Sequence, residues 1–345
     1  MNILGIESSC DETAAAVVED GVTTLSSVVS SQVEMHRPYG GVVPELASRK
    51  HLEMIVPVVN EALHAAGIHK NQVDAVAVTQ GPGLIGALLV GFCFGKSFAY
   101  ALGIPWIGVD HLDGHIHSVF LESPSPEFPF IALLASGGHT SIYHVTSYTR
   151  AECLGQTIDD AAGEAFDKVA KMLGLGYPGG KAIGDLATTG DPDKISFPRP
   201  YLDKDAFNFS FSGLKSAVHR YIQTHPKDYQ DQIADIAAAF QASVIDVLTY
   251  KVMRAAAEKG CRHIALVGGV AANQRLRDRV RAAAQKEGAA VFMPSLHLCG
   301  DNAAMIAAAG YHYLKARRPG DLDSDVYSRS VCSRAASSGT TSTLV

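Results

Sequence analysis

The same short pattern occurs at the start of the chain and again near residue 130: an apolar run, a small polar turn and a second apolar run. It covers residues 2–19, with the turn at 8–13, and residues 130–145, with the turn at 135–140. Apolar runs of this length between small polar residues predict β-strands joined by tight turns. Two copies of one unit predict two similar domains that face each other across a cleft. A chain of 345 residues is long enough for both.

Each polar turn has two interpretations. A strand–turn–strand unit can present backbone N–H groups and hydroxyls to an anion such as phosphate. The alternative is a plain hairpin without a ligand, and Asp20-Gly21, after the second run, is itself a strong hairpin signal.

Strands and helices alternate through the rest of the sequence, which is typical of an α/β protein. Further strands are predicted at residues 73–79, 104–109, 263–267 and 289–293, and helices up to residue 66 and at 84–95, 159–174, 228–259 and 302–315. From Ser328 the sequence is rich in Ser and Thr without an apolar period, so residues 328–345 are predicted to be a disordered tail.

Composition narrows the class of protein. With 35 acidic and 29 basic residues, the net charge of −6 argues against a nonspecific nucleic-acid coat but leaves room for a local basic face. The six cysteines show no Cys-x-x-Cys spacing, which favours reduced thiols in a cytosol. Glu7 breaks the first apolar run, so no secretory signal is expected. The most membrane-like segment, residues 84–95, is shorter than the roughly 20 residues that span a bilayer. We therefore expect a cytoplasmic protein without a membrane span, in which this segment is a buried helix.

His111-Leu-Asp-Gly-His115 is the first candidate site. If this segment is helical, the two imidazoles lie on one face, at a spacing that suits two ligands of one metal. The preceding apolar run places them at the carboxyl end of a strand, where open α/β sheets gather ligands. A chance pair among 14 histidines is the alternative. A zinc peptidase of the His-Glu-x-x-His type is disfavoured, because Leu112 replaces the glutamate that would activate water.

Nine motifs in series resemble one family, the tRNA threonylcarbamoyladenosine transferases (TsaD), formerly described as sialoglycoprotein endopeptidases. They span residues 2 to about 318 and are 5–13, 40–49, 111–115, 136–140, 159–167, 176–180 (Gly-Tyr-Pro-Gly-Gly), 209–215, 268–273 and Asp301-Asn302.

The resemblance implies an actin/Hsp70/sugar-kinase (ASKHA) fold, with two duplicated α/β domains around a nucleotide and metal cleft. The first domain would comprise residues 1–108, completed by a C-terminal helix at about 295–325 that packs back on it, and the second domain residues 109–294. The metal ligands would be His111, His115 and Asp301. The donor, threonylcarbamoyl-AMP, would be bound by nine residues: Leu134, Ala135, Ser136, Gly137, Gly138, Asp167, Gly180, Asn273 and Asp301.

One position departs from the family pattern. Family members often carry an acid four residues after the second glycine of the Tyr-Pro-Gly-Gly turn. Here Gly184 stands at that position and Asp185 follows it, so the family pattern for a contact from position 184 to a sugar hydroxyl is not met.

The implied reaction moves the threonylcarbamoyl group to the N6 amine of the adenosine 3′ of the anticodon, in tRNAs that read ANN codons. Two histidines and one carboxylate leave open metal positions, which suits one Fe(II) per chain, with Zn as the alternative, acting as template and Lewis acid. Asp11 and Glu12 are candidate proton acceptors, although acids in such a turn also serve simply as hydrogen-bond acceptors.

An acidic chain that acts on tRNA is expected to rely on partners. The available basic patches are the arginines of residues 273–281 and Lys315-Ala-Arg-Arg318, and a run of arginines is more often a solvated face. The family resemblance implies a smaller TsaB-like paralogue, which would form a heterodimer with this chain, and a TsaE-like ATPase. Two alternatives to the transferase stay open: a small-molecule kinase of the same fold, and a non-catalytic nucleotide-binding scaffold.

Overall fold

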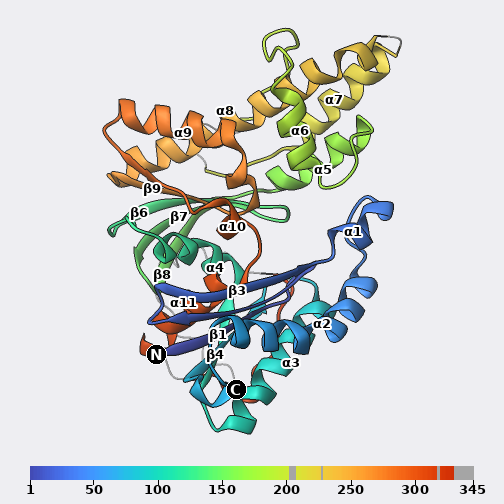
Figure 1. The fold of residues 1–345 in the computed structure, drawn as a ribbon. Coiled ribbons are helices and arrows are strands. Elements are labelled where there is room, and N and C mark those ends of the chain that lie inside the picture. The colour runs from blue at the N-terminus through green and yellow to red at the C-terminus, as the bar shows by residue number, and fades with distance from the viewer. Residues whose placement is uncertain (202–206, 227, 317–318, 330–345) are drawn as a thin grey trace, which may run out of the picture.

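The computed structural model describes residues 1–201, 207–226, 228–316 and 319–329. They form two α/β halves stacked one above the other, each built on a five-stranded mixed sheet (Figure 1). The chain passes from the first half to the second after residue 110 and returns to the first half after residue 292.

The first sheet contains β1 (Asn2–Glu7), β2 (Glu12–Glu19), β3 (Thr23–Ser31), β4 (Ala75–Gly81) and β5 (Trp106–Asp110). Its order is β3-β2-β1-β4-β5. β1, β2 and β3 pair antiparallel, whereas β4 and β5 continue parallel to β1.

The second sheet contains β6 (Phe130–Ala135), β7 (Thr140–Ser147), β8 (Arg150–Gln156), β9 (His263–Val267) and β10 (Ala290–Phe292). Its order is β8-β7-β6-β9-β10, with the same pattern of antiparallel and parallel pairs as the first. The predicted duplication of the strand–turn–strand unit is therefore confirmed, and so is the α/β fold with two sheet domains.

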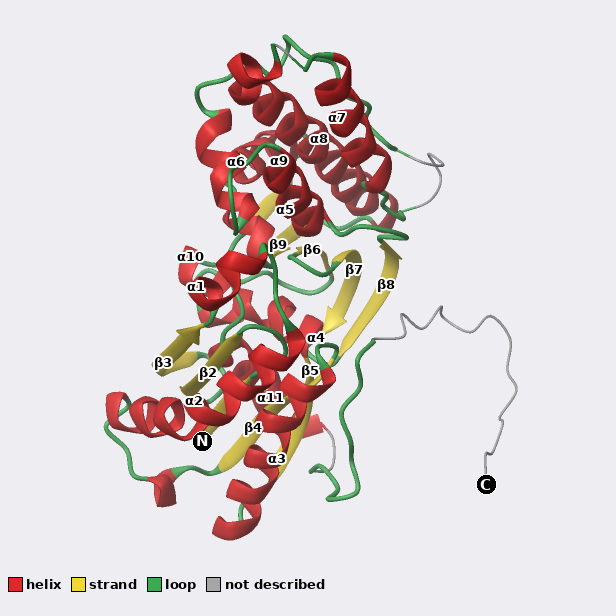
Figure 2. Cartoon of the chain, turned by 90° about the vertical axis from the view of Figure 1, so that its right-hand side faces the viewer, coloured by secondary structure: helices red, strands yellow, loops and turns green. Residues whose placement is uncertain are grey.

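The helices fall into three layers around the two sheets (Figures 1 and 2). α2 (Pro44–Ala65) and α3 (Ile85–Leu102) cover the outer face of the first sheet. Between the sheets lie α11 (Ala303–Ala316), against the first sheet, and α4 (His111–His117), against the second. The outer face of the second sheet is covered by the remaining long helices, which are α5 (Ala162–Met172), α6 (Gly179–Ala187), α7 (Ser212–Thr224), α8 (Ile233–Lys259) and α9 (Gln274–Lys286). Among the described residues, two short α-helices lie in the connections, α1 (Val33–His36) and α10 (Leu296–Cys299).

α11 lies directly on β1, which attaches this late segment of the chain to the first half. A Cβ on Gly5 would lie 2.1 Å from the carbonyl oxygen of Ala303, so only glycine permits this approach. Of the C-terminal segment predicted to be helical at about 295–325, α10 and α11 are helical, whereas residues 319–325 are not. The boundaries at residues 108 and 294 stay a prediction.

Residues 319–329 form an extended strap along the first half (Figure 2). Lys96 Nζ donates to the carbonyls of Leu322 (2.5 Å) and Ser324 (2.9 Å) in this strap. The Tyr327 hydroxyl donates to Asp110 Oδ2 over 2.7 Å. Apart from Ser328 and Arg329, the predicted tail 328–345 lies outside the described residues.

α3 differs from its prediction as a buried helix. Its glycine face is buried, and a Cβ on Gly91 would lie 2.4 Å from Ser8 Oγ. The opposite face is open, with Ile85 43% and Leu89 38% exposed. Two segments, Ile85–Leu102 and Tyr229–Lys259, are long and apolar enough to cross a membrane by length and composition alone, a criterion that core helices of globular proteins also meet.

Candidate metal and nucleotide site

The histidine pair stands where the sequence predicts, on α4 directly after β5. Asp110 begins the helix, because its Oδ1 accepts from the backbone N–H of Leu112 over 2.8 Å. Asp301, just before α11, completes the group: its Oδ1 lies 3.5 Å from His111 Nε2 and 3.2 Å from His115 Nε2. The three ligand atoms lie within 4.8 Å of one another. Residues almost 200 positions apart thus converge because α11 returns between the sheets.

The carboxylates and imidazoles of this site shift one another's pKa values toward their charged forms. Burial alone would raise the pKa of the Asp301 carboxyl, but His111 and His115 outweigh burial and hold that pKa below its ordinary value. Burial lowers the pKa of His111, and the carboxylates of Glu7 and Asp301 reverse this and raise it to about 9. The arrangement is therefore an imidazole between two carboxylates.

The residues fit a metal ion. Both ring nitrogens of His115 are buried without a hydrogen-bond partner, although Nε2 faces Asp301. Buried imidazole nitrogens without partners are unfavourable, and a metal at Nε2 would remove part of this penalty. Two imidazoles and one carboxylate with open positions are the donor set of non-haem Fe(II) sites and also suit Zn²⁺.

Asp11 and Glu12 lie at the first polar turn, near this group. Burial, followed by the charge of Asp301, raises the pKa of Asp11. Burial raises the pKa of Glu12 to about 7, against the hydrogen bond that Ser31 donates to its Oε1 over 2.8 Å. The second oxygen, Oε2, is buried without a partner. Glu12 can therefore hold or release a proton near neutral pH.

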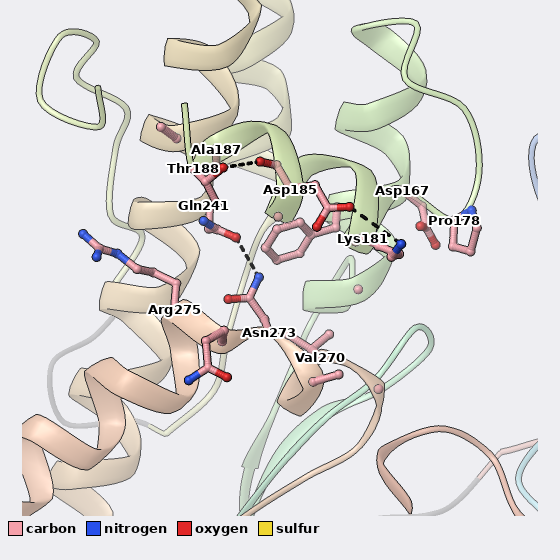
Figure 3. Close-up of a pocket in the computed structure, with 18 of the residues that line it drawn as sticks. Asp167, Pro178, Lys181, Asp185, Ala187, Thr188, Gln241, Val270, Asn273 and Arg275 are labelled. Carbon is pink, nitrogen blue, oxygen red and sulfur yellow. Dashed lines mark hydrogen bonds and ion pairs between the residues drawn. The ribbon is translucent and has the colours of Figure 1, made fainter. Parts of the chain in front are cut away.

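A cavity of about 1000 Å³ lies at the base of the helical layer in the second half (Figure 3). Four of the predicted donor-binding residues line it: Gly137, Asp167, Gly180 and Asn273. The other five predicted residues do not line this cavity: Leu134, Ala135, Ser136, Gly138 and Asp301. Leu134 and Ala135 are fully buried on β6, so any ligand contact from them would come from the backbone.

Two of the residues predicted to bind the donor, Asp167 and Asn273, also make hydrogen bonds within the protein. Asp167 Oδ1 accepts from the N–H of Gly179 over 2.7 Å and so holds the start of α6 against α5. Asn273 caps α9 through its side-chain oxygen, which accepts from the Leu276 N–H, and its Nδ2 donates to Gln241 Oε1 over 2.6 Å (Figure 3). Gln241, 6% exposed on α8, lines the cavity and was not predicted.

The comparisons with known proteins agree with the motifs. The family model for TsaD, tRNA N6-adenosine threonylcarbamoyltransferase, matches residues 23–308. A protein of that name from Desulforapulum autotrophicum is 61% identical over 95% of this chain and 99% of its own length. Another from Symbiobacterium thermophilum is 54% identical over 93% of this chain and 94% of its length. This chain belongs to the tRNA N6-adenosine threonylcarbamoyltransferase family. It is accordingly a transferase.

Solved structures of low identity show the fold of this TsaD family member. HypF of T. kodakarensis aligns with a TM-score of 0.64 at 16% identity, over 91% of this chain and 48% of HypF. An activator of 2-hydroxyisocaproyl-CoA dehydratase from Clostridium difficile aligns with a TM-score of 0.54 at 15% identity, over 92% of this chain and 96% of its own. Both neighbours have the ASKHA-type fold, which confirms the predicted fold class.

Sequence reasoning missed three polar residues of this TsaD family site. Glu7 contacts His111. His51 Nδ1 lies 2.7 Å from Thr13 Oγ1 and shares a hydrogen bond with it, and His51 Nε2 donates to the Cys10 carbonyl over 2.9 Å. These two contacts fix the first polar turn. Burial and the nearby His111 and His115 lower the pKa of His139 to about 4, so it is neutral at pH 7. The signal that could have found Glu7 is a carboxylate that directly follows an apolar run predicted to be a buried strand.

The arginines of residues 273–281 do not form one open basic face. Arg277 points inward, donating to the carbonyls of Ala271 and Pro294, each over 2.6 Å. Arg279 pairs with Asp246 and Arg281 with Asp278. In the other predicted patch, Arg317 and Arg318 lie outside the described residues.

Proposed function

We propose that this transferase moves the threonylcarbamoyl group from threonylcarbamoyl-AMP to the N6 amine of the adenosine 3′ of the anticodon, in tRNAs that read ANN codons. The observations that carry the proposal are the His111–His115–Asp301 group, in which both histidines are buried and Asp301 is partly buried, and a cavity whose lining includes bare glycine backbone. The relatives' name supplies the substrate class. The site is proposed to act in the cytoplasm.

The chain's own residues would bind the donor and place it. Gly137 and Gly180 leave open space where a side chain would stand, since an added Cβ would meet no atom within 4 Å at either position. Backbone there can approach phosphate and sugar closely. Asp301 would serve both the metal and the donor.

One Fe(II) per chain, with Zn as the alternative, is proposed at His111, His115 and Asp301, where it would supply Lewis acidity toward donor oxygens. In the transfer, the N6 nitrogen forms a bond to the carbamoyl carbon, the bond from that carbon to the AMP phosphate oxygen breaks, and the amine loses a proton. Glu12, with its pKa of about 7, is the stronger candidate for the proton acceptor, and Asp11 is the other.

Mass analysis of tRNA nucleosides tests the activity. Purified protein, donor, unmodified tRNA and the proposed partners should yield threonylcarbamoyladenosine. His115→Ala should remove the product, whereas His219→Ala, at an exposed position on α7, should not. A full yield from His115→Ala would contradict the role of the site, and no product from any mixture would contradict the activity.

Partners are proposed on the first half. Leu52 (66% exposed) and Val56 (49%) on α2 lie on the same outer layer as Ile85 (43%) and Leu89 (38%) on α3. Exposed apolar side chains on adjoining helices are typical of a protein interface. We propose that a smaller TsaB-like paralogue binds there as a heterodimer, and that a TsaE-like ATPase and tRNA complete the assembly. Turnover on tRNA by the isolated chain, at the rate of the mixture, would contradict this dependence.

The other reactions that the sequence left open fit the site less well. Leu112 is 5% exposed and packs in the core between α4 and the second sheet. The position that holds the catalytic glutamate in a peptidase is therefore occupied here by a core side chain. A kinase binds Mg²⁺ through oxygen ligands and has no use for two imidazoles. A scaffold would bind nucleotide and leave the RNA unchanged, which the nucleoside analysis distinguishes.

A further inference from the structure

Glu7 is a fully buried carboxylate at the end of β1, with 0% exposure, directly after the buried residues 3–6. A buried charge of this kind needs partners to be tolerated. Three donors surround it. The Ser9 backbone N–H donates to Oε1 over 2.5 Å, and the Thr79 hydroxyl donates to Oε2 over 2.6 Å. The third is Nδ1 of His111, 3.0 Å from Oε2.

These contacts determine which ring nitrogen of His111 carries the proton. Since a carboxylate only accepts, the close contact requires the proton on Nδ1. The other nitrogen, Nε2, is then the one that faces Asp301, 3.5 Å away. Ser9 Oγ, 3.3 Å from Nδ1, can also accept from it but does not dictate the tautomer, because a hydroxyl donates as well. A histidine that ligates through one nitrogen commonly donates its other N–H to a carboxylate in this way.

We propose that Glu7 is a positioning residue for the metal site: it fixes the ring of His111 so that Nε2 ligates the ion. This rests on the proposed metal site and adds a residue to it from a strand 104 positions away in the sequence. In this role Glu7 acts through His111 and needs no contact of its own with the ion or the substrate.

The isosteric variant Glu7→Gln separates positioning from packing. The amide has one acceptor oxygen for three donors, and the Ser9 N–H cannot turn away. With the oxygen on Ser9, the amide N–H₂ faces His111 Nδ1, which favours a proton on Nε2 and removes the lone pair that would ligate the metal. Removing such a partner typically weakens metal affinity 10- to 100-fold. Thr79→Val is the matched control, because it removes a donor to the same carboxylate without touching His111.

The test uses zinc as a diamagnetic probe and cobalt for affinity. In zinc-loaded wild-type protein, nitrogen-15 NMR of the histidine rings should show the His111 proton on Nδ1. Cobalt titration should give a dissociation constant roughly 10- to 100-fold higher for Glu7→Gln and within about threefold for Thr79→Val, relative to wild type. Circular dichroism of the metal-free proteins checks that each variant is folded.

Two results would overturn the inference. Ligation through Nδ1 in the wild-type protein would do so without any variant, so the test survives if Glu7→Gln fails to fold. Equal cobalt affinity of folded Glu7→Gln and wild type would remove the role of Glu7 while the metal site stands. Wild-type protein that binds neither metal would overturn the site itself, and the positioning role with it.

Discussion

Replacing Gly180 with valine should weaken nucleotide binding with little change in stability. Gly180 is the second residue of α6, and an added Cβ meets no atom within 4 Å, so the side chain enters the cavity without a clash. A backbone N–H can approach a phosphate oxygen to about 2.9 Å, whereas a methyl group holds it at about 3.5–4.0 Å. The ligand is therefore moved by up to about 1 Å, or loses a hydrogen bond.

The size of the effect follows from that lost contact. A hydrogen bond to a charged group contributes about 1.5–3 kcal/mol, which corresponds to roughly 10- to 100-fold in affinity. Stability should change by less than about 0.5 kcal/mol, because valine and glycine differ by only that much in helix propensity. The assay is calorimetric titration with AMP, paired with urea unfolding of the unliganded protein.

Gly179 provides the matched control. A Cβ there would lie 2.6 Å from Asp167 Cα and 2.7 Å from the Phe166 carbonyl oxygen, inside the packed protein. Gly179→Ala should therefore reduce the free energy of unfolding by about 1–3 kcal/mol. AMP affinity that is unchanged in Gly180→Val would refute the placement of the nucleotide at α6. A large loss of stability in that variant would refute the inference that the space beside Gly180 is open.

Three further results are expected. His111→Ala or His115→Ala should lose most bound iron, by metal analysis, while the fold is kept; full occupancy in both would contradict the ligand assignment. The pKa of Glu12 is raised from 4.5 to about 7 in the folded protein. The contribution of Glu12 to the free energy of unfolding is therefore fully present below pH 4.5 and is lost as the pH rises through 7. Above pH 7, the free energy of unfolding of Glu12→Gln should therefore be higher than that of wild type by ~1–2 kcal/mol, a figure discounted for partial exposure. Near pH 4 the two free energies should be equal. Urea unfolding at both pH values checks this. Leu52→Glu should weaken heterodimer formation at least tenfold by analytical ultracentrifugation and leave AMP binding unchanged, whereas equal association would place the interface elsewhere.

Local sequence rules were sufficient where the interacting residues are close in the chain. The spacing of His111 and His115 predicts one helical face, and α4 confirms it because Asp110 caps the helix directly after a buried strand. The strand–turn–strand repeats likewise predict both hairpins. The duplication follows from them, since each sheet continues with parallel strands added next to its first strand.

The rest depends on contacts that no local pattern contains. Glu7 and His111 meet only because β1 and the end of β5 lie in one sheet, and Asp301 joins them only because α11 returns to it. The open face of α3 could not be predicted either. An apolar helix of this composition suits a buried core and a docking surface equally well, and only the packing against the first sheet shows which side is covered.

Gly184 shows where transfer of a family motif must stop. A Cβ at this position would lie 3.6 Å from Asn273 Nδ2 and 3.8 Å from Gln241 Oε1, which are ordinary contact distances. An acidic side chain would therefore fit and would face the amide of Asn273 inside the cavity. Asp185, the next residue, also lines the cavity, but its side chain is 74% exposed and its carboxylate lies 3.8 Å from Lys181 Nζ, four residues back on the same helix (Figure 3). Such an exposed pair contributes little energy and no buried charge. In this chain α6 therefore lines the cavity with bare backbone at Gly180 and with the exposed Asp185 and Lys181, and no carboxylate stands at position 184 beside the Asn273–Gln241 pair.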